Sequence, residues 1–282
     1  MLTRHPQFAM ITSSVVEALV SVRRLSSFLN ARELQPDARS IGARPSDDSD
    51  SDAPVLEVID ATLTWDDTDT GLPPVLEGLN LTVRKGELVG VLGRVGSGKT
   101  SLLSAVIGEM VRTDGSIIVR GSIACAPQNP WIMSGTIRDN IVFSHEFDPE
   151  FYDAVLDACA LRPDLETMKD GEMTVVGERG LSLSGGQRAR IALARAVYAR
   201  ADLYLLDDVL AAVDSHVARH VFDNVLGPRG LLRDKARVLV TNTVAFVRQF
   251  DNLVFMRRGI ILEQDSYANV MARENSELWR LM

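Results

Sequence analysis

The segment Gly93–Thr100 constrains the fold of this chain more than any other part of its sequence. It has the sequence GRVGSGKT and matches the pattern G-x-x-x-x-G-K-[ST] of a phosphate-binding loop. The apolar run Glu87–Leu92 before it predicts a buried strand, and Thr100–Ile107 after it has apolar residues at helical spacing. A strand, a glycine-rich loop and a helix in this order predict an α/β fold built around a nucleoside triphosphate site.

The residue types of this loop suit a triphosphate. Its glycines allow backbone N–H groups to turn towards phosphate oxygens, and the following helix N-terminus adds its positive dipole end. We expect Lys99 to reach the β- and γ-phosphates and the hydroxyl of Thr100 to ligate Mg²⁺. The candidate nucleotide-binding residues of the loop are Gly93, Gly96, Ser97, Gly98, Lys99 and Thr100.

A second motif, LSGGQ, occupies Leu183–Gln187 and stands before a predicted helix at Arg188–Ala199. Ser184 can cap this helix, and the two glycines beside it leave backbone N–H groups free to meet an anion. Taken alone, the motif also fits an ordinary helix cap with a flexible approach. The LSGGQ motif therefore indicates a function only in combination with the other motifs of the chain.

A short strand ending in two carboxylates completes the set of motifs. The apolar run Asp202–Leu206 predicts this strand, and Asp207 after it is expected to hold the Mg²⁺ shell. In the order phosphate loop, Gln128, LSGGQ, apolar strand and aspartate, the chain resembles the nucleotide-binding domains of ABC transporters. Kinases and small GTPases lack the LSGGQ signature, which excludes them.

The resemblance covers residues 55–282 and extends to a subfamily. Ala126–Ile132 (APQNPWI), Gly135–Ile141 (GTIRDNI) and Ala212–Val217 (AVDSHV) are similar to the first nucleotide-binding domain of the C subfamily, the multidrug-resistance-associated exporters. The resemblance implies a P-loop NTPase core with a small antiparallel β-subdomain and a helical signature subdomain at about residues 129–200. It implies ATP and Mg²⁺ as cofactors, and ATP hydrolysis coupled to transport.

The same resemblance implies partners and residue roles. The partners are a second nucleotide-binding domain and transmembrane domains, at the cytoplasmic face of a membrane. Two such domains sandwich two ATP molecules, so the signature residues Ser184, Gly185, Gly186 and Gln187 would meet the ATP held by the partner. Trp65 matches an aromatic that stacks on adenine, with an ordinary strand aromatic as the alternative. Gln128 would sense Mg²⁺ and water while contacting the membrane domain.

Two positions depart from the pattern of a hydrolytic member. Asp208 stands where such members carry a glutamate that polarises the attacking water. The side chain of Asp208 is one methylene shorter than that of glutamate, so its carboxylate lies roughly 1 Å farther from the attacking water. Such a misplacement can cost on the order of a hundredfold in rate. Asn242 replaces a histidine that contacts the γ-phosphate, and an amide cannot become cationic. The candidate catalytic residues are Asp208, Gln128 and Asn242; the candidate metal ligands are Thr100, Gln128 and Asp207.

Three functions remain open at this point. The chain is half of an ATPase that drives export, with a degenerate phosphate site of its own, or it is a regulatory ATP-binding module without turnover. The third is a soluble, non-transport ABC ATPase acting on ribosomes or DNA. The formal net charge of −8 argues against a nucleic-acid partner, because the nucleic-acid backbone demands a basic face.

The first 54 residues differ in character from the rest. Residues 1–35 predict a helix whose apolar stretch Phe8–Val22 is short of the roughly 20 residues that span a membrane. It is either an amphipathic helix packed on the domain or the cytosolic end of a truncated transmembrane helix, and the resemblance together with Arg23 and Arg24 favours the second. Residues 36–54 are rich in Ser and Asp and predict a disordered linker.

The remaining elements follow from apolar patterns. Val55–Trp65 and Leu79–Val83 predict strands of the antiparallel subdomain, with a turn at Asp66–Pro74 between them. Val238–Thr241 and Asn252–Met256 predict further buried strands. Pro149–Leu161 begins with proline and predicts a helix of the signature subdomain.

Overall fold

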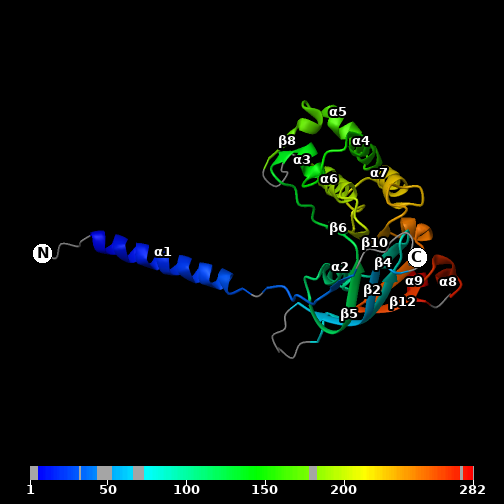
Figure 1. The fold of residues 1–282 in the computed structure, drawn as a ribbon, viewed down its shortest axis with the longest axis horizontal. Helices are drawn as coiled ribbons and strands as arrows, with labels where there is room; N and C mark the ends of the chain where they lie inside the picture. The colour runs from blue at the N-terminus through cyan, green and yellow to red at the C-terminus, as the bar shows by residue number, and fades with distance from the viewer. Residues whose placement is uncertain are drawn as a thin grey trace. The chain divides into compact units, whose positions relative to one another are not determined.

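The computed structural model describes residues 6–31, 33–42, 53–65, 73–177, 183–273 and 276–281. The chain divides into two compact units, Met1–Leu34 and Gln35–Met282 (Figure 1). In the first unit, helix α1 (Pro6–Leu29) is continuous, and its described apolar side chains from Met10 onwards are exposed. Among the described residues, no helix combines the length and the apolar character that crossing a membrane requires.

The second unit is built on a six-stranded sheet with the order β12-β11-β4-β10-β9-β6. All neighbouring strands are parallel except β12, which pairs antiparallel with β11. The central strands are buried along their whole length, which explains why their sequences are apolar apart from Arg237 in β10 and Asp207 at the end of β9, because a parallel sheet is covered on both faces. The strands are β4 (Leu88–Leu92), β6 (Ile123–Ala126), β9 (Leu203–Asp207), β10 (Ala236–Val240), β11 (Asn252–Arg257) and β12 (Ile260–Asp265).

A four-stranded sheet with the order β1-β5-β2-β3 forms the predicted β-subdomain. β2 pairs antiparallel with both β3 and β5, whereas β1 runs parallel to β5. The sequence did not reveal β5, whose apolar half follows a polar start at Arg112–Gly115. Residues 66–72 of the predicted turn lie outside the described residues. The strands are β1 (Ser40–Gly42), β2 (Leu56–Thr64), β3 (Leu76–Val83) and β5 (Val111–Arg120).

Helices cover the six-stranded sheet and form a lobe. α2 (Lys99–Ile107) packs with the β-subdomain, and the lobe α3–α6 gathers at one end of the sheet (Figure 1). The lobe contains α3 (Ile137–Val142), α4 (Pro149–Ala158), α5 (Arg162–Thr167), α6 (Gly185–Tyr198), the 3₁₀ helix η1 (Gly171–Met173) and the strands β7 (Gly135–Thr136) and β8 (Val175–Val176). The other helices are α7 (Ser215–Val221), the π-helix η3 (Phe222–Leu226), the 3₁₀ helix η4 (Val244–Gln249), α8 (Tyr267–Met271) and α9 (Glu277–Leu281).

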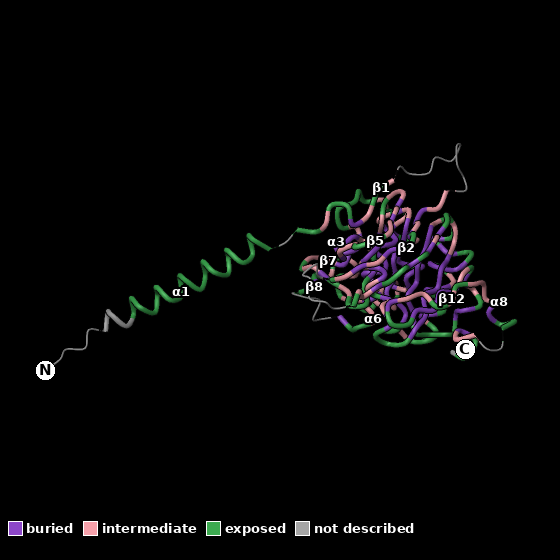
Figure 2. Tube along the Cα trace, turned by 90° about the horizontal axis from the view of Figure 1, so that it is seen from below, coloured by how far each residue is buried: buried purple, intermediate pink, exposed green. Residues whose placement is uncertain are grey.

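The core lies on both faces of the six-stranded sheet. Along β4, Leu88 and Leu92 belong to the cluster shared with the helical lobe, whereas Val89 and Val91 belong to the cluster shared with α2 and the β-subdomain. This alternation follows from the two-residue period of a strand. Figure 2 shows the buried residues concentrated within the second unit. The predicted P-loop NTPase fold is confirmed.

The prediction of a disordered linker over residues 36–54 was wrong for its first part. Ser40–Gly42 forms strand β1, which pairs in parallel register with Ile118–Arg120 of β5. Ala38 is buried. Strand pairing rather than burial of large apolar side chains holds this segment, and backbone pairing leaves no signal in composition. Residues 43–52 of the predicted linker lie outside the described residues.

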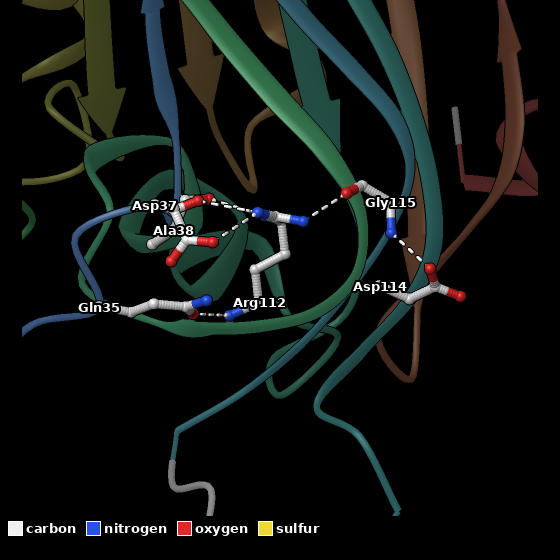
Figure 3. A network of polar contacts seen from close by, with 6 residues as sticks. All are labelled: Gln35, Asp37, Ala38, Arg112, Asp114 and Gly115. Carbon is white, nitrogen blue, oxygen red and sulfur yellow. Dashed lines mark hydrogen bonds and ion pairs between the residues drawn. The ribbon is translucent and has the colours of Figure 1, made fainter.

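Arg112 of β5 fastens residues 35–38 of this segment to β5 (Figure 3). Its guanidinium donates to the backbone carbonyls of Asp37 at 2.9 Å and Ala38 at 3.3 Å, and also to the carbonyl of Gly115. Its backbone N–H donates to the side-chain oxygen of Gln35 at 2.8 Å. One arginine thus donates hydrogen bonds to carbonyls of both the 35–42 segment and β5.

We expect Arg112→Ala to release residues 35–42 from β5. Hydrogen bonds from a charged group contribute about 1.5–3 kcal/mol, so amide exchange over Ser40–Gly42 should accelerate by at least about tenfold. Hydrogen exchange followed by mass spectrometry measures this directly. The matched control Arg229→Ala changes an exposed arginine outside the network. Unchanged exchange in the Arg112 variant would show that strand pairing alone holds the segment.

Candidate nucleotide-binding site

The phosphate loop adopts a conformation that its glycines make possible. Gly98 precedes α2 with a φ of 102°, a left-handed conformation that glycine adopts without strain. A Cβ atom on Gly93 would lie 2.4 Å from the carbonyl oxygen of Met256 and 2.6 Å from the hydroxyl of Ser97. Both positions therefore exclude a side chain, which explains why the first and last of the motif's glycines, Gly93 and Gly98, cannot be replaced by larger residues without strain.

Lys99 lies inside this loop. Its side chain is only 8% exposed, and its ammonium donates to the carbonyls of Gly93 at 2.8 Å and Arg94 at 3.1 Å. Burial lowers the pKa of Lys99, while the carboxylates of Asp207 and Asp208 act in the opposite direction. The loop therefore surrounds a cation at the place where phosphate charge is predicted to bind.

The structure brings two of the three predicted Mg²⁺ ligands, Thr100 and Asp207, together although they are far apart in sequence. The hydroxyl of Thr100 donates to Asp207 Oδ2 at 2.8 Å. Asp207 is buried at the end of β9, where burial raises its pKa and the hydrogen bond from Thr100 lowers it. A hydroxyl and a carboxylate side by side form the oxygen donor set that Mg²⁺ prefers.

The site lies at one edge of the six-stranded sheet. Strands β4, β6, β9 and β10 are parallel and in contact through β9 and β10, so the segments that follow them meet. These segments carry Gly93, Gln128, Asp208 and Asn242. Crevices beyond the carboxyl ends of parallel strands are the usual ligand sites of such sheets.

A cavity of about 300 Å³ opens at this edge. It is lined by nearly all of the predicted phosphate, metal and catalytic residues. The lining also includes residues that the sequence did not point to, Val75, Arg258 and Gly259. The predicted residues in the lining are Gly96, Ser97, Gly98, Lys99, Thr100, Gln128, Asp207, Asp208 and Asn242.

The chemistry of this lining fits a phosphate group with a divalent cation. Ser97 is 5% exposed, and its hydroxyl is buried without a hydrogen-bond partner in the described part of the chain. A buried hydroxyl of this kind needs a partner, and a phosphate oxygen is a suitable one. The cavity lining thus contains a hydrogen-bond donor in Ser97, a cation in Lys99, and oxygens suited to a metal in Thr100 and Asp207.

Asp208 and Asn242 contact each other in the cavity. Asn242 Nδ2 donates to Asp208 Oδ2 at 3.2 Å. The backbone N–H of Asp208 donates to the carbonyl of Val240 at 2.9 Å, and its φ of 51° is left-handed. The backbone of β10 thus holds Asp208, and one of the two carboxylate oxygens of Asp208 accepts a hydrogen bond from the Asn242 amide.

The turn between β11 and β12 supports the phosphate loop, which the sequence did not predict. Gly259 N–H donates to the carbonyl of Ser97 at 2.9 Å, and Arg258 beside it has a left-handed φ of 52°. A Cβ atom on Gly259 would lie 2.0 Å from the carbonyl oxygen of Val75. The Arg-Gly pair between two apolar runs is a hairpin signal, but nothing in it indicates contact with the loop.

The signature residues form a capped helix start outside the cavity lining. Ser184 Oγ accepts the N–H of Gln187 at 3.2 Å, and Gln187 Oε1 accepts the N–H of Ser184 at 2.9 Å. This reciprocal pair is a capping box at the start of α6. The cavity lining includes neither Ser184–Gln187 nor Trp65, which lies just after β2 with 52% of its surface exposed. The role of Trp65 towards adenine stays a prediction.

Comparison with known proteins agrees with this geometry. Residues 76–211 match the family model described as "ABC transporter". The chain is 46% identical over 273 residues to the metal resistance protein YCF1 of Saccharomyces cerevisiae. It is 45% identical over 265 residues to ATP-binding cassette sub-family C member 2 of Mus musculus, and 43% identical over 273 residues to the transporter abc2 of Schizosaccharomyces pombe.

These alignments differ in how much of each protein they cover. They include 97%, 94% and 96% of this chain, in the same order. They include only 18%, 16% and 18% of the relatives' own length. The chain thus spans less than a fifth of each of these relatives.

Proposed function

Since this chain carries an ABC transporter domain similar to those of the C subfamily, we propose that it is the first nucleotide-binding domain of a multidrug-resistance-associated exporter. Its domain is of the ABC-type ATPase class. In this proposal it binds Mg-ATP at the cytoplasmic face of a membrane and works with a second nucleotide-binding domain and transmembrane domains. The much greater length of the relatives supports partners of this kind.

The residues around the cavity have separate tasks in this proposal. Lys99 and the hydroxyl of Ser97 bind phosphate oxygens, and Thr100 and Asp207 hold Mg²⁺ beside them, with Gln128 at the same edge. The metal would neutralise negative charge between the β- and γ-phosphates. Asp208 orients the attacking water from a carboxylate that is one methylene short. Asn242 donates a hydrogen bond towards the γ-phosphate but carries no positive charge.

The contact between Asn242 and Asp208 is the observation that carries the proposal of a degenerate site. The amide occupies one oxygen of the carboxylate that must bind the water, at 3.2 Å. The predicted phosphate and metal ligands line the cavity together, whereas the predicted groups for cleavage are a shorter carboxylate and a neutral amide that are hydrogen-bonded to each other. We therefore infer that this site binds ATP well and cleaves it slowly, and that the isolated domain is weak or inactive.

The same observation supports a second function, a regulatory module that holds ATP without turnover. The two functions differ at the partner site, because the first requires the signature Ser184–Gln187 to complete an active site on the second domain. A soluble, non-transport ABC ATPase is disfavoured by the net charge of −8 and by the transporters among the relatives.

We expect the isolated chain to bind radiolabelled Mg-ATP and to return it unhydrolysed. The reason is that the binding groups all lie on one chain, while the water lacks a well-placed carboxylate. Filter binding followed by chromatography of the released nucleotide measures both parts. The Lys99→Ala chain serves as the control for contaminating ATPases. Release of ADP as the main product by the parent, but not by this control, would contradict the degenerate site.

A further inference from the structure

A carboxylate on α5 contacts the signature loop, the name used here for Ser184–Gln187 at the start of α6. No sequence motif indicated this carboxylate. We propose that Asp164 is a positioning residue for the signature loop, and through it for the ATP site that this loop completes on the partner domain. The inference rests on the proposed function, because it assigns the loop to the partner's nucleotide. Asp164 lies in the first turn of α5, and its side chain is 19% exposed.

The side-chain amide of Gln187 connects Asp164 to the loop. Its nitrogen donates to Asp164 Oδ1 at 3.0 Å, while its oxygen accepts the N–H of Ser184 at 2.9 Å. A carboxylate only accepts hydrogen bonds, so it forces the NH₂ group of the amide to face it. The oxygen of the amide must then face Ser184. Asp164 therefore sets the orientation on which the capping box depends.

The second oxygen of Asp164 holds Arg190 against the loop. Arg190 Nη2 donates to Asp164 Oδ2, and the Arg190 side chain is 13% exposed. Another nitrogen of the same guanidinium lies 3.5 Å from the position that a Cβ atom on Gly186 would take. That position is also 2.9 Å from the carbonyl oxygen of Ala212. Gly186 is thus packed between the guanidinium and a backbone carbonyl.

These contacts restrain the side of the loop that faces Asp164 and Arg190, and they leave the side at Gly185 open. A Cβ atom on Gly185 would meet nothing within 4 Å, so this face is open. In this proposal Ser184 and the two glycines after it must contact a phosphate held by another domain. The contacts of Asp164 and Arg190 therefore hold these residues in place before the nucleotide binds. Preorganisation matters because a displacement of about 1 Å in a catalytic group can cost on the order of a hundredfold in rate.

The first part of the test uses the chain itself. In Asp164→Ala, amide exchange in the peptide covering Gly185–Ala189 should accelerate by about tenfold or more, while exchange in β9 stays unchanged. Mg-ATP affinity at the chain's own phosphate loop should remain within about twofold, because the cavity lining does not include Asp164. The matched control is Asp153→Asn, whose side chain is 61% exposed and pairs with Arg162 at 3.3 Å.

The second part uses the full-length transporter that carries this chain. Asp164→Ala should lower kcat for ATP about tenfold or more, with a smaller change in KM, because the loop meets the transition state on the partner. Asp164→Asn should fall between parent and alanine, since an amide oxygen still accepts from Gln187 but carries no charge to attract Arg190. If Asp164 acts through Gln187, the Asp164→Ala/Gln187→Ala double variant should be no slower than the slower single variant.

Several results would overturn the inference. Unchanged exchange over Gly185–Ala189, additive effects of the two alanine variants, or full turnover in Asp164→Ala would each do so. Accelerated exchange in β9 as well would assign Asp164 to general stability instead. Failure of the proposed function is separate: it would appear as nucleotide binding that does not depend on Lys99, whatever Asp164 does.

Discussion

Replacing Asp208 by Glu and Asn242 by His together should raise ATP turnover at this domain's own site by about a hundredfold or more. Glu returns the carboxylate to reach of the water, and a shift of about 1 Å is worth on the order of a hundredfold. His adds a group that can carry positive charge at the γ-phosphate. The double change also removes the Asn242–Asp208 hydrogen bond that occupies one carboxylate oxygen.

The two changes should reinforce each other, because they act on one transition state and their side chains are in contact. Steady-state phosphate release from the proposed full-length transporter, with its other site disabled, measures the turnover of the parent, single and double variants. Asp208 has a left-handed φ of 51°, which Asp tolerates better than most residues, so thermal stability must be measured alongside. Asp234→Glu, at a side chain 77% exposed, is the matched control. Parent turnover equal to that of the double variant would refute the degenerate site.

Lys99→Ala should lower the affinity of the isolated chain for Mg-ATP by about a hundredfold. Hydrogen bonds to charged groups contribute about 1.5–3 kcal/mol each, and this ammonium lies among the cavity-lining residues. The substitution also removes its bonds to the carbonyls of Gly93 and Arg94. Titration calorimetry measures the affinity, and Lys169→Ala, an exposed lysine of the helical lobe, is the control. Equal affinity in the parent and the Lys99 variant would remove the phosphate-loop assignment.

The site was predictable where function depends on contiguous residues. The phosphate loop combines strand, glycines, lysine and helix within one short segment, so its motif by itself identifies Lys99 and Thr100. The prediction of Asp207 as a metal ligand followed from its position at the end of the apolar run Asp202–Leu206. The structure places its carboxylate 2.8 Å from the Thr100 hydroxyl. The roles of all these residues towards nucleotide and metal remain predictions, as do those of Trp65, Gln128, Asp208, Asn242 and the signature residues.

The fold was predictable where apolar patterns are unbroken. The fully buried strands β4, β9 and β10 each contain an apolar run, Leu88–Leu92, Leu203–Leu206 and Val238–Val240, so their existence followed from the sequence. The sequence did not predict β5 because its first half is polar. It did not predict β1 because this strand has only three residues, Ser40–Gly42, too few to show an apolar pattern. For the same reason, the disorder predicted for residues 36–54 does not hold at Ser40–Gly42.

The sequence alone predicted the chemistry of this protein: a triphosphate loop, a metal-binding aspartate, and an aspartate and an asparagine where the resemblance leads us to expect a glutamate and a histidine. Only the tertiary structure revealed how Gly259 supports the loop, how Arg112 fastens residues 35–42 and how Asp164 holds Gln187. The physical reason is the nature of these contacts. Backbone carbonyls and single polar side chains, distant in sequence, make them, and such groups produce no periodicity or motif.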